Sequence, residues 1–220
     1  MKSKRKIITS ILVLLITGCA RLPLISQMVS QPTQEAERDV LFFDDFSETK
    51  SGWDRFQGEI GTTDYVKETY QITINEAITD LFANPSLHFS DVIIEVSASK
   101  LEGNEANNFG IICRYQDENN FYAGMISSDG YAGIFRIQNG KYQQLGHKEM
   151  QPMPAILGGS GKNLIHLECI GESIALAVNG IPVDARQDKT FKEGDVGLIA
   201  GTFDQPGVRI AFDDFKVMRP

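Results

Sequence analysis

From residue 40 onward, apolar and polar residues alternate over short stretches, and no stretch keeps the 3.6-residue period of an amphipathic helix. In residues 109–115, for example, Phe109, Ile111 and Cys113 fall on one face of an extended strand and Arg114 falls on the other. Turn residues separate such stretches at spacings of roughly ten residues, which is typical of an antiparallel sandwich or barrel. We therefore predict strands over 40–43, 65–68, 70–74, 86–99, 108–116, 121–127, 130–138, 141–147, 163–170, 173–178, 181–186, 194–200 and 208–218.

The connections between these stretches carry residues that favour tight turns. Asn139-Gly140 and Asn179-Gly180 each favour the left-handed backbone of a two-residue hairpin loop. Residues 153–161 are rich in Pro and Gly and predict a crossing between two sheets.

The two ends of this region carry similar segments. Residues 41–46 read Leu-Phe-Phe-Asp-Asp-Phe, and residues 210–215 read Ile-Ala-Phe-Asp-Asp-Phe. We predict that the first and last strands lie side by side, which would cover an otherwise open sheet edge.

The first 38 residues have a different pattern. Four basic residues between positions 2 and 6 precede an uncharged apolar run over 7–16, and Ile16-Thr17-Gly18-Cys19 closes it. This order predicts a secretory signal peptide over 1–18, because the apolar run is too short to span a membrane. The closing tetrapeptide resembles a bacterial lipobox, which implies that cleavage leaves Cys19 as a lipidated N-terminus with acyl chains such as palmitate.

This reading divides the chain into three parts. The segment 1–18 is the predicted lipoprotein signal peptide, 19–38 is the lipidated cysteine with a polar, flexible tether, and 39–220 is the β-sandwich domain. The expected location is the bacterial cell envelope, outside the cytoplasm, with the membrane as a partner through the lipid anchor.

Charge narrows the range of partners. The chain has 21 basic and 29 acidic residues and a formal charge of −8. Residues 1–18 hold four of the basic residues and no acidic one, so the mature chain keeps 17 basic against 29 acidic residues, a charge of −12. A domain of this sign lacks the basic surface that nucleic acid or anionic lipid would require, and nucleic acid is not an expected partner.

The chain has three cysteines, one in the predicted lipobox and two in the β-sandwich domain. If Cys19 carries lipid, Cys113 and Cys169 remain as a pair in an oxidising compartment. The alternation of their strands places both side chains on inward faces. The pair is thus interpreted as a disulfide, and two buried free thiols are the alternative.

Several short motifs follow one another along the domain in a characteristic order. They are Asp44–Ser47, Ser51–Trp53, Phe109–Gln116, Asn119–Tyr122, Val178–Gly180, Gly194–Leu198 and Phe212–Phe215. Together they resemble the concanavalin A-like jelly roll, in the branch of laminin G-like and 3-keto-disaccharide-hydrolase-like domains found on bacterial lipoproteins. The resemblance implies two curved antiparallel sheets, of which the concave one is often used for sugars.

Retaining glucanases of the same fold carry three alternating acidic residues on one strand, which places an acid and a nucleophile on one face. Here Glu193 and Asp195 alternate, but Gly197 takes the third position. This departure favours a domain without catalysis, and we assign no catalytic residue.

Two pairs of carboxylates, Asp44-Asp45 and Asp213-Asp214, are candidates for a structural calcium site if the first and last strands pair. The alternative is that they are solvated carboxylates at strand ends. No motif predicts any other cofactor.

The candidate ligand-binding residues are Arg114, Tyr122 and Arg136, because an outward arginine beside an exposed ring suits a sugar or peptide. Tyr122, Arg136 and His166 would join Arg114 if their strands line the same sheet, and the alternative is a solvated sheet face. Most other rings are expected in the core. The hypothesis is a lipid-anchored, non-catalytic β-sandwich that binds a glycan or an envelope protein. The alternatives are a hydrolase of the 3-keto-disaccharide hydrolase type and a purely structural envelope protein.

Overall fold

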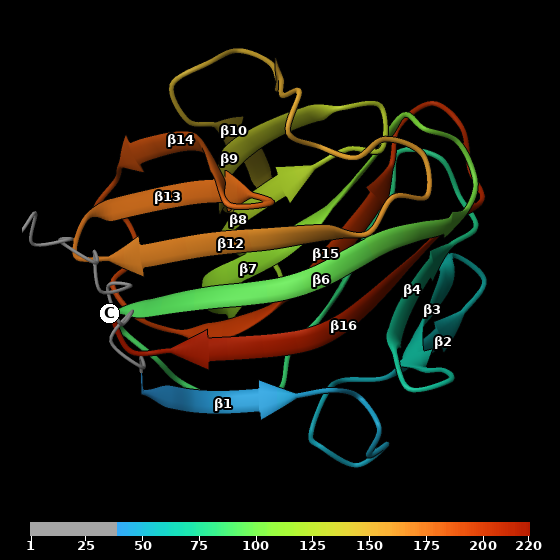
Figure 1. Cartoon of the computed structure of the whole chain (residues 1–220), viewed down its shortest axis with the longest axis horizontal. Coiled ribbons are helices and arrows are strands. Elements are labelled where there is room, and N and C mark those ends of the chain that lie inside the picture. Colours follow the sequence, from blue (N-terminus) through green and yellow to red (C-terminus); the bar gives the residue numbers. More distant parts are fainter. Residues whose placement is uncertain (1–38) are drawn as a thin grey trace, which may run out of the picture. The chain divides into compact units, whose positions relative to one another are not determined.

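The structure is a computed structural model that describes residues 39–220. This part of the chain is all β: sixteen strands form two antiparallel sheets that pack face to face (Figure 1). No helix in residues 39–220 is long and apolar enough to cross a membrane. The predicted fold class, a two-sheet antiparallel sandwich, is confirmed.

The nine-stranded sheet lies in front in Figure 1 and has the order β14-β13-β12-β6-β16-β4-β3-β2, with β1 also paired to β16. Its strands are β1 (Val40–Asp44), β2 (Phe56–Gly58), β3 (Gly61–Tyr65), β4 (Tyr70–Ile74), β6 (Val92–Glu102), β12 (Asn163–Ile170), β13 (Ser173–Val178), β14 (Ile181–Gln187) and β16 (Val208–Met218).

The seven-stranded sheet lies behind it and has the order β10-β9-β8-β7-β15-β5, with β11 also paired to β9. Its strands are β5 (Asp80–Ala83), β7 (Asn107–Asp117), β8 (Asn120–Ile126), β9 (Tyr131–Gln138), β10 (Lys141–Gln144), β11 (Gln151–Pro152) and β15 (Asp195–Thr202). The loop 153–161 joins β11 to β12 and thus passes between the sheets, as predicted.

The main core lies between the sheets and follows the alternation of the strands. In β12, for example, Ile165, Leu167 and Cys169 are fully buried and face the other sheet, whereas His166 and Glu168 are partly exposed. Large aromatic side chains fill one end of this core: Phe46, Trp53, Tyr65, Tyr70 and Phe215.

The first and last strands pair, as predicted. Val40 lies opposite Met218 and Asp44 opposite Phe215, in antiparallel register. The Asp44 carboxylate holds the end of β1 in place, because its Oδ2 accepts a hydrogen bond of 2.9 Å from the Trp53 indole nitrogen.

Some predicted boundaries are wrong. Residues 65–68 were expected to form a strand, but the strand ends at Tyr65 and a tight turn follows in which Lys67 and Glu68 have φ of 51° and 59°. The predicted strand 86–99 begins only at Val92. The four-residue strand β5 was missed because so short a stretch shows little alternation.

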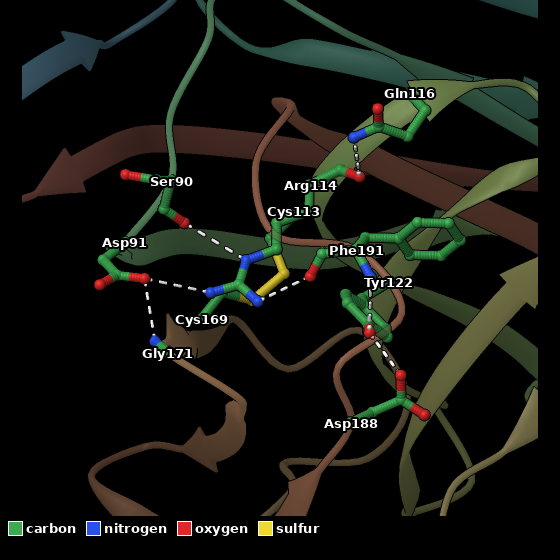
Figure 2. Close-up of a disulfide and its surroundings, with 10 residues drawn as sticks. All are labelled: Ser90, Asp91, Cys113, Arg114, Gln116, Tyr122, Cys169, Gly171, Asp188 and Phe191. Atoms are coloured by element: carbon green, nitrogen blue, oxygen red, sulfur yellow. Dashed lines mark hydrogen bonds and ion pairs between the residues drawn. A yellow bond between two sulfur atoms is a disulfide. The ribbon is translucent and has the colours of Figure 1, made fainter.

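A disulfide joins the two sheets through the core. Cys113 of β7 and Cys169 of β12 are fully buried, and their sulfurs are bonded (Figure 2). The predicted bridge is present, and the alternative of two free thiols is not what the structure contains. The bond links strands of opposite sheets that are 56 residues apart in sequence.

Candidate functional site

The outer face of the seven-stranded sheet is concave. Phe82 of β5 and Phe121 of β8 are three strand intervals apart, about 14 Å in a flat sheet, yet their ring centroids are 5.8 Å apart. Tyr115 of β7 completes the group, with centroids 5.7 Å from both rings. The rings meet because the sheet curls toward this side.

A second apolar cluster fills the floor of this concave face. Its buried members project outward from the sheet and have no second sheet above them; they are Ile112, Phe121, Ala123, Met125, Ile137 and Ile199. Phe82, Tyr115, Phe135 and Met150 pack over them and stay partly exposed. Both faces of β7, β8 and β9 are therefore apolar, which explains their nearly continuous hydrophobic sequence.

Two tyrosine rings remain exposed on this face. Tyr131 begins β9 on the same side as Phe135 and is 42% exposed, and Tyr142 of β10 lies opposite Ile137 and is 47% exposed. An exposed ring on a concave sheet offers a flat apolar surface with a polar tip, which suits stacking against another ring-shaped molecule.

Asp80 is the polar centre of one end of the concave face. It lies opposite Gly201, which lies opposite Asn108, and the Asn108 Nδ2 donates a 3.3 Å hydrogen bond to Asp80 across that glycine. A side chain at Gly201 would collide with Asp80 and Asn108, so the contact requires glycine. The Tyr142 hydroxyl lies near enough to Asp80 to influence its protonation.

Burial changes the protonation of this group. It raises the pKa of the Asp80 carboxyl, although hydrogen bonds from Tyr142 and Asn108 act in the opposite direction. Burial and then the nearby Asp80 charge raise the pKa of Tyr142. The Asn108 Oδ1 is buried without a hydrogen-bond partner in the described residues. An acceptor oxygen is therefore left unused beside Asp80.

Further titratable groups gather at the opposite end of the same face. Burial raises the pKa of Asp195, and the Asp54 charge adds to the effect. Burial also raises the pKa of Tyr115 to about 12, again with a contribution from Asp54. Asp195 has a structural role as well, since its Oδ1 accepts hydrogen bonds from the backbone nitrogens of Leu87 and Val196 at 3.0 and 2.8 Å.

The structure corrects the prediction for Arg114. Arg114 is only 2% exposed and does not face outward, because β7 carries a bulge here in which Arg114 adopts φ of 53°. Figure 2 shows its guanidinium donating to the backbone oxygens of Ser90 and Phe191 and to the carboxylate of Asp91. The Asp91 carboxylate also accepts from the Gly171 nitrogen. Arg114 of β7 is thus linked, directly or through Asp91, to residues 90–91, to Phe191 and to Gly171.

Tyr122 and Arg136, the other predicted ligand residues, also bind the protein itself. Tyr122 is fully buried and faces the core, and its hydroxyl donates to Asp188 at 2.6 Å and accepts from the Phe191 nitrogen (Figure 2). Arg136 lies opposite Tyr122 and binds the other Asp188 oxygen at 2.7 Å. All three predicted residues therefore converge, but on the loop 188–191 that leads into β15.

The four carboxylates proposed for calcium do not come together. Asp44 is buried and committed to Trp53 and to the Phe46 nitrogen, and Asp45 caps the following turn through Ser47. Asp213 forms an ion pair with Lys162, and Asp214 occupies a bulge with φ of 53°. Within residues 39–220 no three His, Cys, Asp or Glu side chains are grouped as a metal would require. The metal hypothesis is not supported.

His166 belongs to the other sheet. It lies in a shallow hollow of the nine-stranded sheet, between Glu95 and Glu168, with a 3.0 Å contact from each carboxylate to one ring nitrogen. The hydrogen bond to Glu95 raises the pKa of His166, against the effect of burial, and the bond to Glu168 adds to it. His166 cannot join the concave face.

Sequence reasoning thus missed the polar residues of the concave face. Asp80 and Asn108 lie on a short strand and at a strand end, and nothing in their spacing shows that they meet. The sequence also gives no sign that the rings of Tyr131 and Tyr142 are exposed while most other rings are buried. The predicted signal peptide 1–18, the lipidation at Cys19 and the tether to residue 38 lie outside the described residues.

Comparison with known proteins identifies similar folds and no relative in sequence. No family model and no curated protein matches the sequence. Among solved structures, the chain is similar to the carbohydrate-binding module CBM66 from Bacillus subtilis, with a TM-score of 0.63 and 20% identity over 77% of this chain and 96% of that one. A protein of unknown function with a galectin-like fold from Bacillus subtilis gives 0.60 and 12% over 82% and 96%.

A third similar structure is an enzyme. The β-glucanase of Bacillus licheniformis gives a TM-score of 0.56 and 10% identity over 81% of this chain and 98% of that one. Identities this low establish the fold alone. The chain has the concanavalin A-like jelly-roll fold that the motif order predicted.

Proposed function

We propose that this protein is a lipid-anchored envelope protein whose β-sandwich binds a glycan on the concave face of the seven-stranded sheet. The observation that carries the proposal is the exposure of Tyr131 and Tyr142 on that face, beside the Asp80 carboxyl. Sugars are bound by rings that cover their apolar faces and by polar groups that meet their hydroxyls.

The polar groups of the face fit this role. Asp80 accepts hydrogen bonds, and the Asn108 Oδ1 is an acceptor without a partner in residues 39–220. A sugar hydroxyl can supply the donor that these acceptors lack. The fold is also that of a carbohydrate-binding module, which supports a glycan partner over a protein partner.

The test is a glycan array with the full chain in detergent, followed by titration of the best binder. Tyr142→Ala and Tyr131→Ala should each weaken binding about three- to tenfold, because a stacked ring contributes roughly 0.5–1.5 kcal/mol. Phe43→Ala is the matched control, since Phe43 is 49% exposed but belongs to β1. An array without any bound glycan, or equal losses in the control, would contradict the proposal. Pull-downs that recover only proteins would favour a structural envelope role.

One observation favours a second candidate, a carbohydrate-active hydrolase of the 3-keto-disaccharide hydrolase type. Burial raises the pKa of Asp195, the Asp54 charge adds to the effect, and perturbed carboxyls gather at catalytic sites. Asp80 cannot be the partner of Asp195. It lies opposite Gly201, six residues further along β15, which is about 20 Å away, whereas glycosidase carboxyls lie about 5–9.5 Å apart.

The hydrolase is tested by turnover of 3-keto-glycosides. If activity disappears in both Asp54→Asn and Asp195→Asn while the variants stay folded, the hydrolase function is favoured over the non-catalytic binding function. If the unmodified chain does not turn over 3-keto-glycosides, the hydrolase hypothesis is excluded.

A further inference from the structure

We propose a second binding site on the opposite sheet, a groove that takes a saccharide bearing a carboxylate. The groove is a hollow of about 510 Å³ on the outer face of the nine-stranded sheet, over β4, β16 and β6. It is defined by Lys67, Gln71, Ser97, Ser99, Lys162 and Arg209. This site goes beyond the proposed glycan face and shares no residue with it.

Short side chains make the floor of the groove. Ala211 of β16 lies between Gln71 of β4 and Ser99 of β6 in one cross-strand row, and Asp213 lies opposite Ser97. Lys67, in the turn after β3, lies at one side of the groove. Lys162, just before β12, lies at the other side. A molecule in the groove would rest on this floor between two ammonium groups.

Several hydrogen-bond donors of the groove are left uncommitted. Within residues 39–220 the hydroxyls of Ser97 and Ser99 make no hydrogen bond, and Lys67 forms no ion pair. The Nε of Arg209 is buried and has no acceptor. A buried donor without a partner carries a desolvation cost that an oxygen of the ligand would remove.

Both carboxylates that line the groove are paired with cations. The Asp213 carboxylate accepts from Lys162 at 3.2 Å, and Glu102 forms an ion pair with Arg209. Asp214 lies 4.0 Å from the same Lys162 ammonium, so Lys67 is the cation of the lining that has no carboxylate partner in residues 39–220, in a chain of formal charge −8. The groove therefore favours an acceptor-rich, anionic ligand over a neutral or cationic one.

The groove differs from the concave face in how it would hold a sugar. None of the described residues that line it is aromatic, so a bound saccharide would be held at its edges by hydrogen bonds and charge. Hydroxyl oxygens would meet Ser97 and Ser99, and the carboxylate would meet Lys67 and Arg209.

The probe is trigalacturonic acid, with its fully methyl-esterified form as the neutral counterpart on the same backbone and acetate as a simple anion. Titration of the full chain in detergent should give binding of the acid at least about tenfold tighter than of the ester, and weaker binding at higher salt. Lys67→Gln should weaken binding of the acid about threefold, and Lys67→Gln with Lys162→Gln more strongly. The exposed Lys50 supplies the matched control Lys50→Gln, which should change nothing.

Each other outcome overturns the proposal. Acid and ester that bind equally, no binding of the acid, full competition by acetate, or equal effects of Lys50→Gln and Lys67→Gln would each do so. Tyr142→Ala separates the two sites. It should leave binding of the acid unchanged; if it abolishes that binding, the acid saccharide occupies the concave face, and the groove is wrong while the glycan face stands.

Discussion

The Tyr142 hydroxyl lies beside the Asp80 carboxyl, although β10 and β5 are the two opposite edges of the seven-stranded sheet. Four strands separate them, so the contact exists only because the sheet curls into a trough. The pair lies across the concave face and places a carboxyl with a raised pKa beside a partly exposed tyrosine.

The first prediction concerns the pH dependence of stability at Asp80. A carboxyl whose pKa is raised by folding stabilises the folded state below its unfolded value of 3.8, and this contribution is lost as pH rises through the folded pKa. The unfolding free energy of the unmodified chain should therefore fall relative to that of Asp80→Asn between about pH 4 and pH 7. Denaturant titrations of both proteins across this range measure the difference, and parallel curves would contradict it.

Arg114 should matter for stability and not for ligand binding. Its guanidinium is buried and makes three bonds to Ser90, Asp91 and Phe191, so Arg114→Ala leaves these acceptors unpaired and should cost roughly 3 kcal/mol. Arg114→Lys should cost less, because it keeps the charge but loses the planar donors. The control is Arg55→Ala, an exposed partner of Asp64 whose loss should cost below about 1 kcal/mol. A stable Arg114→Ala protein that no longer binds glycan would restore the original assignment.

The disulfide should be detectable and stabilising. Mass spectrometry without reduction should find the Cys113 and Cys169 peptides linked, with neither thiol alkylated after denaturation. Replacing both by Ala should lower the unfolding free energy by about 4 kcal/mol on the loop-entropy model for a loop of this length. Glycan binding should survive, because both sulfurs lie in the core. Full alkylation without reductant would refute the bridge.

His166 should titrate above the usual pKa of 6.5, because Glu95 and Glu168 bind its two ring nitrogens. A raised histidine pKa gives stability that is complete below the unfolded value and is lost as pH rises through the folded pKa. His166→Gln should therefore cost more at about pH 6 than at about pH 9. NMR titration of the imidazole measures the pKa directly. A value at or below 6.5 would show that the carboxylates do not hold the proton.

Cys19 lies outside the described residues, and its lipidation stays a prediction. Cys19→Ser should leave the precursor unprocessed or release the protein from the membrane fraction, because no acyl chain can then be attached. Metabolic labelling with a fatty acid should mark the unmodified chain only. Equal labelling of both proteins would exclude this residue as the anchor.

The sequence predicted what depends on local alternation. The inward parity of Cys113 and Cys169 led to the disulfide, and the two similar end segments led to the pairing of β1 with β16. Parity fails where a strand bulges, because one extra residue turns the next side chain to another face. Arg114 lies in such a bulge.

Parity also fails where both faces of a strand are apolar. In β8, Phe121 faces the concave side and Tyr122 faces the core, and neither position is polar enough to mark its face. The concave face itself depends on the curvature of the sheet, which brings Asp80 to Tyr142 from opposite edges. No spacing within one strand contains that information.

The pairing of β1 with β16 has a mechanical consequence. If the chain is tethered through the residues before 39, tension enters the domain at Val40, which forms the outermost pair of the β1–β16 ladder. The β1–β16 pairs would separate one after another from that end, until the force reaches Asp44 and its hydrogen bond with the Trp53 indole. Beyond this point the load falls on the aromatic end of the core and on sheets that the disulfide holds together. β1 would therefore detach first under tension. The two sheet faces that carry the proposed sites would keep their structure.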